Sequence, residues 1–371
     1  MKKVLSYILV AIGVACVTSC NSDFLKEYSQ SLARVQSVDD LEELLMGDCL
    51  LPKGYVNVES STWIMRNPNY AVLHFMGDEL KENLEIDTEP YDLGSRTSMF
   101  PYFTWQQNTY VDYLGKSSLE SEEANYWTLA YDKINNCNIV MDAAQQFDCK
   151  SAEEKLKCQT IEGETYFLRA FYYLTLVNLY GKPYSPATAS SDLAVPIKTS
   201  PVIEDKEFQR ASVAEVYDLI VSDLSHAENL LGTVKKPVSI YHASLETVYI
   251  LRSRVALYMQ DWQVASDYAQ KALDIDGTLT NLIGAGGSLY PMNKDNAEVI
   301  YSNGSSCFGN YIFEEPKRTY YASYYAPVFC ISDDLYNLYD DNDSRKTTYI
   351  STEDDVYAHV PTYHKIDFSR G

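Results

Sequence analysis

The sequence predicts a mainly α-helical protein built from helix pairs like those of tetratricopeptide repeats. Apolar residues recur at helical spacing in several segments, and two of these segments open with a capping box. A third observation is a helix pair in which alanines stand beside large aromatic residues, so that the helices can approach closely. The predicted helices are Ser37–Met46, Asn125–Phe147, Ser151–Gly181, Val213–Leu231, Ser244–Met259 and Asp261–Asp274.

The longest predicted helix has clear start and stop signals. Ser151 is followed three residues later by Glu154, which is the capping-box pattern. Gly181 is expected to end the helix in the left-handed conformation, and Pro183 prevents its continuation. Gly163 lies among large aromatic residues, which indicates that another helix packs closely against this one.

The other long helices are predicted from the same kinds of signal, a capping box and an apolar face. Ser212 and Glu215 form the second capping box. Asn138 lies on an apolar helix face, where an interhelical hydrogen bond is expected rather than a ligand contact. Trp127 and Trp262 fit helix faces and are predicted to be core residues.

The end of the sequence is less regular. Glu298–Ser302 is predicted to be a strand, and Ser332–Tyr339 a short helix. Leu51–Tyr113 mixes glycine, proline, asparagine and aromatic residues and is predicted to form loops and short helices. Most of the cysteines outside the N-terminal segment are expected to be small buried residues: Cys49, Cys137, Cys149, Cys158, Cys307 and Cys330.

Three stretches of the predicted helices resemble one known family. They are GETYFLRAFYYLTLVNLYG at 163–181, YDKINNCNIV at 131–140 and RASVAEVYDLIVSDL at 210–224. On these motifs the chain is identified as a member of the SusD/RagB family. The resemblance implies a SusD-like α–α superhelix with a loop-rich ligand-binding portion. It also implies one such domain over residues 20–371, lacking the family's C-terminal helices.

The same resemblance implies a function. Members of the family are non-enzymatic lipoproteins of the outer membrane that bind oligosaccharides or polysaccharides at the cell surface. They deliver the glycan to a SusC-like TonB-dependent outer-membrane transporter. No cofactor is implied.

The N-terminus is consistent with export. Lys2 and Lys3 precede the mostly apolar segment Val4–Val17, which is too short to span a bilayer and is typical of a secretory signal peptide. Small residues then lead to Cys20, the predicted lipidation site, so residues 1–19 would form a lipoprotein signal peptide. The alternative is an ordinary signal peptide with an incidental cysteine.

Charge and motifs argue against nucleic-acid binding, catalysis and metal binding. A formal net charge of −22 disfavours binding to nucleic acid. We find no P-loop, no G-x-S-x-G and no zinc-ligand spacing, so no catalytic residue, metal or cofactor is predicted. Asp340, Asp341 and Asp343 loosely resemble a calcium loop but lack the glycine and glutamate of an EF-hand.

The candidate ligand-binding residues are aromatic and lie in the irregular segments. An indole can stack on a sugar ring while amide or guanidinium groups bond to its hydroxyls. The alternative for Trp105 is that it fills a gap between loops and helices. The predicted ligand-binding residues are Trp105, Tyr102, Asn108, Arg96, Tyr324 and Tyr325.

Two other functions stay open on the sequence alone. One is a helical-repeat adaptor that binds only proteins. The other is a helical glycoside hydrolase, which needs two carboxylates across a cleft. With 52 acidic residues in the chain, some pair will meet that requirement by chance.

Overall fold

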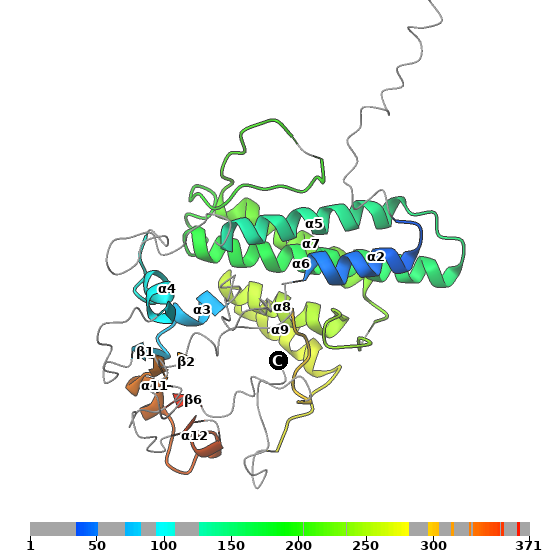
Figure 1. Cartoon of the computed structure of the whole chain (residues 1–371). Helices are drawn as coiled ribbons and strands as arrows, with labels where there is room; N and C mark the ends of the chain where they lie inside the picture. The colour runs from blue at the N-terminus through cyan, green and yellow to red at the C-terminus, as the bar shows by residue number, and fades with distance from the viewer. Residues whose placement is uncertain are drawn as a thin grey trace, which may run out of the picture.

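Long helices form most of the structure that is described (Figure 1). The computed structural model describes residues 35–50, 71–82, 94–107, 126–202, 204–234, 236–281, 296–303, 313–314, 326–327, 329–348, 350–351 and 362–363. The main helices are α2 (Val38–Leu44), α5 (Tyr126–Gln146), α6 (Ala152–Tyr180), α7 (Val213–Leu230), α8 (Leu245–Tyr258) and α9 (Trp262–Leu273), with a π-helical turn η3 (Leu45–Cys49) after α2. The prediction of a mainly helical fold with helix pairs is confirmed.

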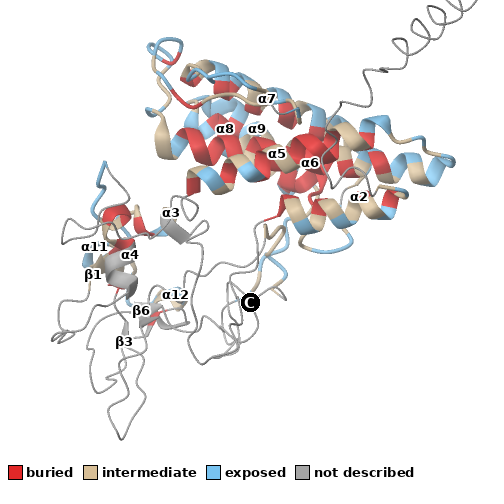
Figure 2. Ribbon diagram, turned by 45° about the horizontal axis from the view of Figure 1, so that its top comes forward, coloured by how far each residue is buried: buried red, intermediate tan, exposed pale blue. Residues whose placement is uncertain are grey.

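Helix α6 is the centre of the helical body. It packs against α5 on one side and α7 on another, and α2 lies along it (Figure 1). Figure 2 shows buried residues concentrated on α5 and α6, with exposed residues on the outer helix faces. Tyr172 and Tyr173 in the C-terminal half of α6 are completely buried and serve packing of the helical body.

The predicted helix starts are confirmed. The Ser151 hydroxyl accepts a hydrogen bond from the backbone N–H of Glu154, and the Glu154 carboxylate accepts one from the backbone N–H of Ser151. Ser212 and Glu215 make the same reciprocal pair at the start of α7. These side chains satisfy backbone donors that a helix start leaves without partners.

Two glycines, one inside α6 and one at its C-cap, have packing roles. A Cβ on Gly163 would lie 2.8 Å from Cγ of Leu231, so a side chain there would collide with the end of α7. Gly181 was expected in the left-handed conformation, but this is wrong, since its φ is −98° and its ψ 176°. Glycine is needed there because a Cβ would lie 2.6 Å from the carbonyl oxygen of Val177.

A second group of elements gathers around short strands. It contains α3 (Ala71–Phe75), α4 (Gly94–Phe103), α11 (Asp333–Leu338) and α12 (Ser344–Thr348). Strand β1 (Leu80–Glu82) pairs antiparallel with β4 (Phe329–Ile331), which joins segments far apart in the sequence. The other antiparallel pairs are β2 (Phe313–Glu314) with β3 (Ala326–Pro327) and β5 (Ile350–Ser351) with β6 (Thr362–Tyr363).

Two further predictions are wrong. Trp262 is not a core residue, because its side chain is 64% exposed. Helix α9 contributes Ala265 and Ala272 to the buried interior, and Trp262 is the first residue of this helix. Glu298–Ser302 is not a strand: a turn ends at Glu298, with the Val299 N–H donating to the Asn296 carbonyl, and residues 299–302 have no regular secondary structure.

Other predictions agree with the structure. The short helix predicted over Ser332–Tyr339 is α11, with Ser332 as its N-cap. The prediction for Trp127 holds only in part, since this residue is half-buried and packs against Tyr131 and Tyr180 at the edge of the core. Among the residues that the structure describes, no helix is both long and apolar enough to cross a membrane.

Candidate functional site

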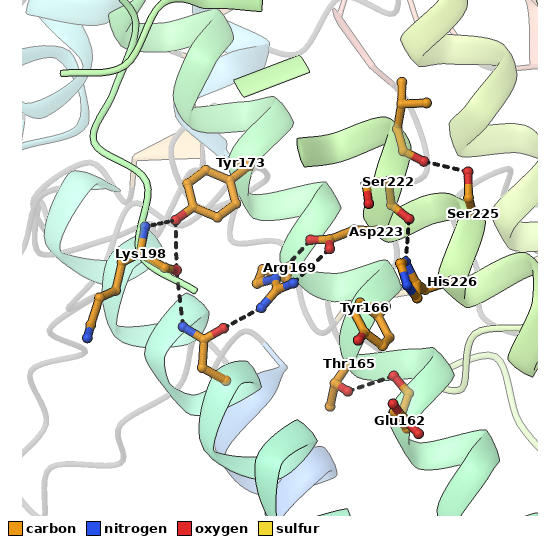
Figure 3. Close-up of polar contacts among 12 residues, drawn as sticks. Glu162, Thr165, Tyr166, Arg169, Tyr173, Lys198, Ser222, Asp223, Ser225 and His226 are labelled. Carbon is orange, nitrogen blue, oxygen red and sulfur yellow. Dashed lines mark hydrogen bonds and ion pairs between the residues drawn. The ribbon is translucent and has the colours of Figure 1, made fainter. Parts of the chain in front are cut away.

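A buried ion pair fixes the helices of the scaffold to one another. Arg169 on α6 donates from Nε and Nη2 to the two carboxylate oxygens of Asp223 on α7, at 2.8 and 2.7 Å. Its Nη1 donates to Oδ1 of Asn138 on α5, at 2.7 Å (Figure 3). One guanidinium therefore links α5, α6 and α7, and Asn138 has the interhelical role that the sequence predicted.

The same network holds the loop between α6 and α7. Nδ2 of Asn138 donates to the backbone carbonyl of Lys198 at 3.1 Å. The hydroxyl of Tyr173 donates to that carbonyl at 3.0 Å and accepts from the Lys198 backbone N–H at 2.7 Å (Figure 3). The loop between α6 and α7 is therefore anchored at Lys198 by side chains of α5 and α6.

Burial is the strongest influence on both charged partners. It raises the pKa of the Asp223 carboxyl, and the bonds from Arg169 act in the opposite direction. Burial alone would lower the pKa of Arg169, but the bonds to Asp223 outweigh it, and the pKa of the guanidinium is raised. Each charge thus depends on the other for solvation, so neither is easily removed alone.

The second group of elements provides a firm base for helix α4. Met99 and Tyr102 of α4 are 1% and 3% exposed. The rings of Phe103 and Phe329 lie 5.1 Å apart, and Phe75 packs edge-on to Phe329 at 4.9 Å. The C-terminal end of α4 is therefore held by aromatic contacts with α3 and β4.

A tight turn follows α4 and carries Trp105. The backbone N–H of Gln106 donates to the Pro101 carbonyl at 2.7 Å, and that of Trp105 donates to the Tyr102 carbonyl at 3.1 Å. This pair of bonds is the Schellman pattern, in which the residue at the Trp105 position takes a positive φ. Thr104 reinforces the turn, since its Oγ1 donates to the Phe100 carbonyl at 2.6 Å.

Trp105 is unusual at this position. Its φ is 55°, in the left-handed region that glycine normally occupies in such a turn. A non-glycine residue there costs about 1–2 kcal/mol, and the indole is 69% exposed, so packing does not offset the cost. The arrangement presents a flat aromatic surface to solvent from a fixed backbone.

The other predicted site residues fall into two groups. The prediction that Tyr102 binds the ligand is wrong, because Tyr102 is only 3% exposed, packs inside the base of α4 and does not offer its ring to a ligand. The backbone of Arg96 lies in α4, while its side chain is outside the described residues. Asn108, Tyr324, Tyr325 and Cys20 also lie outside the described residues.

The acidic segment that resembles a calcium loop uses its carboxylates internally. Asp343 accepts hydrogen bonds from Nε and Nη2 of Arg345, and Asp341 pairs with Lys346 at 2.9 Å. These cations hold the pKa of both carboxyls below its ordinary value. Among the described residues, no three histidine, cysteine or acidic side chains are grouped as metal ligands would be.

Comparison with known proteins agrees with this architecture. The family model for SusD-like proteins described as "Starch-binding associating with outer membrane" matches residues 75–257. SusD-like protein P25 of Formosa agariphila is 26% identical over 179 residues, covering 47% of this chain and 31% of that protein. SusD-like protein P2 of the same organism is 26% identical over 235 residues, covering 62% of this chain and 42% of that protein.

Over residues 75–257, about half of its length, the chain is similar to SusD-like proteins. A SusD superfamily protein of Bacteroides thetaiotaomicron superposes with a TM-score of 0.61 at 20% identity, covering 85% of this chain and 64% of that chain. A SusD-like carbohydrate binding protein of Bacteroides vulgatus gives a TM-score of 0.58 at 21% identity, covering 85% of this chain and 61% of that chain. The matched part of this SusD-like chain spans less than half the length of the two curated relatives.

Sequence reasoning missed the residues that hold the scaffold. Arg169 and Asp223 stand on apolar helix faces, and that position was the available signal of a buried pair. Their pairing was not visible, because it depends on how α6 and α7 pack. The left-handed backbone at Trp105 was also missed, because no glycine or asparagine marks it.

Proposed function

We propose that this SusD-like protein binds oligosaccharides at the cell surface and that the indole of Trp105 is a stacking platform for a sugar ring. The observation that carries the proposal is an exposed tryptophan held at a position that favours glycine. The family description and the carbohydrate-binding relative support the glycan as ligand.

The energetics favour this role over a structural one. A glycine at position 105 would relieve the strain of a positive φ, and the fold gains little from an indole that is 69% exposed. Stacking of one indole face on a sugar contributes on the order of 1 kcal/mol or more. The rigid turn also lowers the entropic cost of binding, because Trp105 is already in place.

The proposed test compares two exposed tryptophans. The purified protein is screened on a glycan array, and binding of the best oligosaccharide is then measured by calorimetry for the native protein, Trp105→Ala and Trp262→Ala. Trp262 is the matched control, because it is 64% exposed but lies on α9. We expect Trp105→Ala to abolish detectable binding and Trp262→Ala to retain it, with nearly unchanged melting temperatures.

Two outcomes would overturn the assignment. If Trp105→Ala binds as tightly as the native protein, the platform lies elsewhere, and Tyr324 and Tyr325 are the next residues to change. If Trp105→Ala lowers the melting temperature strongly, the indole supports the fold and the ligand role is wrong.

The anchoring and the partner are part of the same proposal. Cys20 would carry the lipid, residues 20–371 would form the exported SusD-like domain, and the ligand would pass to a SusC-like TonB-dependent outer-membrane transporter. Cys20→Ala is expected to abolish palmitate labelling and release the exported protein from membranes. Persistent labelling of that variant would exclude Cys20 as the anchor.

A protein-binding adaptor is the second candidate. Several large apolar side chains at the end of α8 and on α9 are exposed, which is favourable for a protein contact. They are Leu257, Tyr258, Trp262 and Leu273, at 50%, 48%, 64% and 55% exposure. Co-purification with a barrel partner that Trp262→Ala abolishes, together with no retention of any glycan, would favour this function.

A further inference from the structure

Two cysteines meet at the turn between α5 and α6. Cys149 lies in the connection after α5, and Cys158 lies in the second turn of α6. Their Sγ atoms are 3.0 Å apart, within about 1 Å of the ~2.05 Å length of a disulfide bond. We propose that Cys149 and Cys158 are a redox-active pair that forms an intramolecular disulfide when the chain meets a disulfide oxidant.

The backbone already holds the two side chains in a bonding position. Cys149 N–H donates to the Phe147 carbonyl at 3.0 Å. One residue further on, Lys150 N–H donates to Oε2 of Glu154 at 2.5 Å, and the capping box at Ser151 fixes the start of α6. To form the bond, the two Sγ atoms must approach each other by about 1 Å.

The environments of the two sulfurs assign different roles to them. Cys149 is partly exposed, so an external oxidant reaches it, whereas Cys158 is only 5% exposed. Burial, followed by the contact with Cys149, raises the pKa of the Cys158 thiol to about 12. Cys149 is therefore the sulfur that attacks first, and Cys158 is the one that completes the bond.

The reaction balances with a protein or small-molecule disulfide as oxidant. The Cys149 thiolate attacks one sulfur of that disulfide, forms a mixed disulfide and releases the other sulfur as a thiolate. Cys158 then loses its proton to water and attacks Sγ of Cys149, which expels the second sulfur of the oxidant as a thiolate. Two thiols of the protein are oxidised, and one disulfide of the oxidant is reduced to two thiols.

A second cysteine pair provides an internal control. Cys49 and Cys137 are both 0% exposed, and a hydrogen bond with Cys137, followed by burial, raises the pKa of the Cys49 thiol well above its ordinary value. No oxidant reaches these sulfurs while the protein stays folded. Selective oxidation of Cys149 and Cys158 is therefore a consequence of their position at the surface of the helical body.

The proposed disulfide would matter most in an exported protein. It would join the end of the α5–α6 connection to α6, the helix that carries Arg169. Disulfides persist in oxidising compartments outside the cytoplasm, so in the cell this inference rests on the export proposed above. The chemistry itself can be tested on purified protein, so its result does not depend on the export or the glycan proposal.

The test is peptide mapping after controlled oxidation. The full chain is purified, reduced, freed of reductant and incubated folded with oxidised glutathione. Free thiols are then blocked with iodoacetamide during unfolding, and the digest is analysed by mass spectrometry. We expect a linked pair of peptides containing Cys149 and Cys158, about 2 Da lighter than their reduced sum. Cys49 and Cys137 should be alkylated.

Single variants distinguish a specific pair from general reactivity. In Cys158→Ser, Cys149 should carry a glutathione adduct because its resolving sulfur is absent, and no linked peptide should form. The proposal is wrong if native Cys149 and Cys158 are both recovered alkylated, each as a separate glutathione adduct, or linked between two chains. The native peptide map decides the question even where a variant does not fold.

Discussion

Removing Arg169 should destabilise the protein strongly, because Asp223 would lose the group that solvates its charge. The side chains of Arg169 and Asp223 are 6% and 3% exposed, so water does not replace the lost partner. Breaking a buried pair by removing one member typically costs about 3–5 kcal/mol. Arg169→Met also removes the bond to Asn138, so we expect a cost near the upper end of that range.

A double-mutant cycle separates the pair from the burial of its side chains. The four proteins are the native chain, Arg169→Met, Asp223→Leu and the double variant, each unfolded in urea and followed by circular dichroism. Each single change should cost about 3–5 kcal/mol, whereas the double variant should cost less than the sum by at least ~2 kcal/mol.

Two results would refute this reasoning. A cost below about 1 kcal/mol for Arg169→Met would mean that Asp223 is solvated in some other way. Strict additivity in the cycle would mean that the two charges do not stabilise each other. Asn138→Ala is a useful comparison, because it removes a neutral partner of the same guanidinium and should cost only about 1–3 kcal/mol.

Three further predictions test packing, electrostatics and backbone strain. Gly163→Ala should lower the free energy of unfolding in urea by about 1–2 kcal/mol, because the collision of the new methyl group with the end of α7 outweighs the gain in helix propensity. Gly47→Ala is the control and should not destabilise the protein, because a Cβ at Gly47 has no atom within 4 Å. Nδ1 of His242 lies 3.2 Å from Oε1 of Glu164, and this hydrogen bond raises the pKa of the imidazole. The charged imidazole therefore stabilises the fold at low pH, so His242→Asn should cost more stability at about pH 6 than at about pH 9. An unchanged cost across that range would show that the imidazolium is not stabilised by folding. Gln260→Gly should raise stability by up to about 1 kcal/mol, because φ is 64° at the end of α8; a loss would show that its side chain contributes more than the strain costs.

Local signals were sufficient to predict the helices. Capping depends on a few neighbouring residues, so Ser151 with Glu154, and Ser212 with Glu215, identified the starts of α6 and α7 from the sequence. Apolar spacing likewise predicted that α7 buries one face, and the structure confirms it.

Features that depend on tertiary contacts were not predictable in the same way. Gly181 is extended rather than left-handed, and a Cβ there would lie close to atoms of Val177 and Ala194, which no local rule includes. Trp262 has the spacing of a core residue but stays exposed, because α9 packs mainly through two alanines. The pairing of β1 with β4 joins distant segments that have no sequence pattern in common.

The candidate site was predictable only in part, and the reason is physical. Trp105 was identified because it is an aromatic residue without helical periodicity, and the structure shows it exposed. Tyr102, three residues earlier, has the same composition signal, yet it faces the interior, since an α-helix turns successive side chains toward different surroundings. Whether an aromatic residue can serve as a platform therefore depends on the exact end of α4.

The scaffold and the proposed platform depend on different interactions, so their losses should be separable. Arg169 stabilises the packing of α5, α6 and α7, and its removal affects the whole helical body. Trp105 takes part in its turn through a hydrogen bond of its backbone N–H, and any residue but proline at this position can form the same bond. Trp105→Gly should therefore bind no glycan and yet be at least as stable as the native protein, because glycine relieves the positive φ. A gain of stability with a loss of binding is a combination that a structural tryptophan cannot produce, and it would identify the strain at Trp105 as a requirement of ligand recognition.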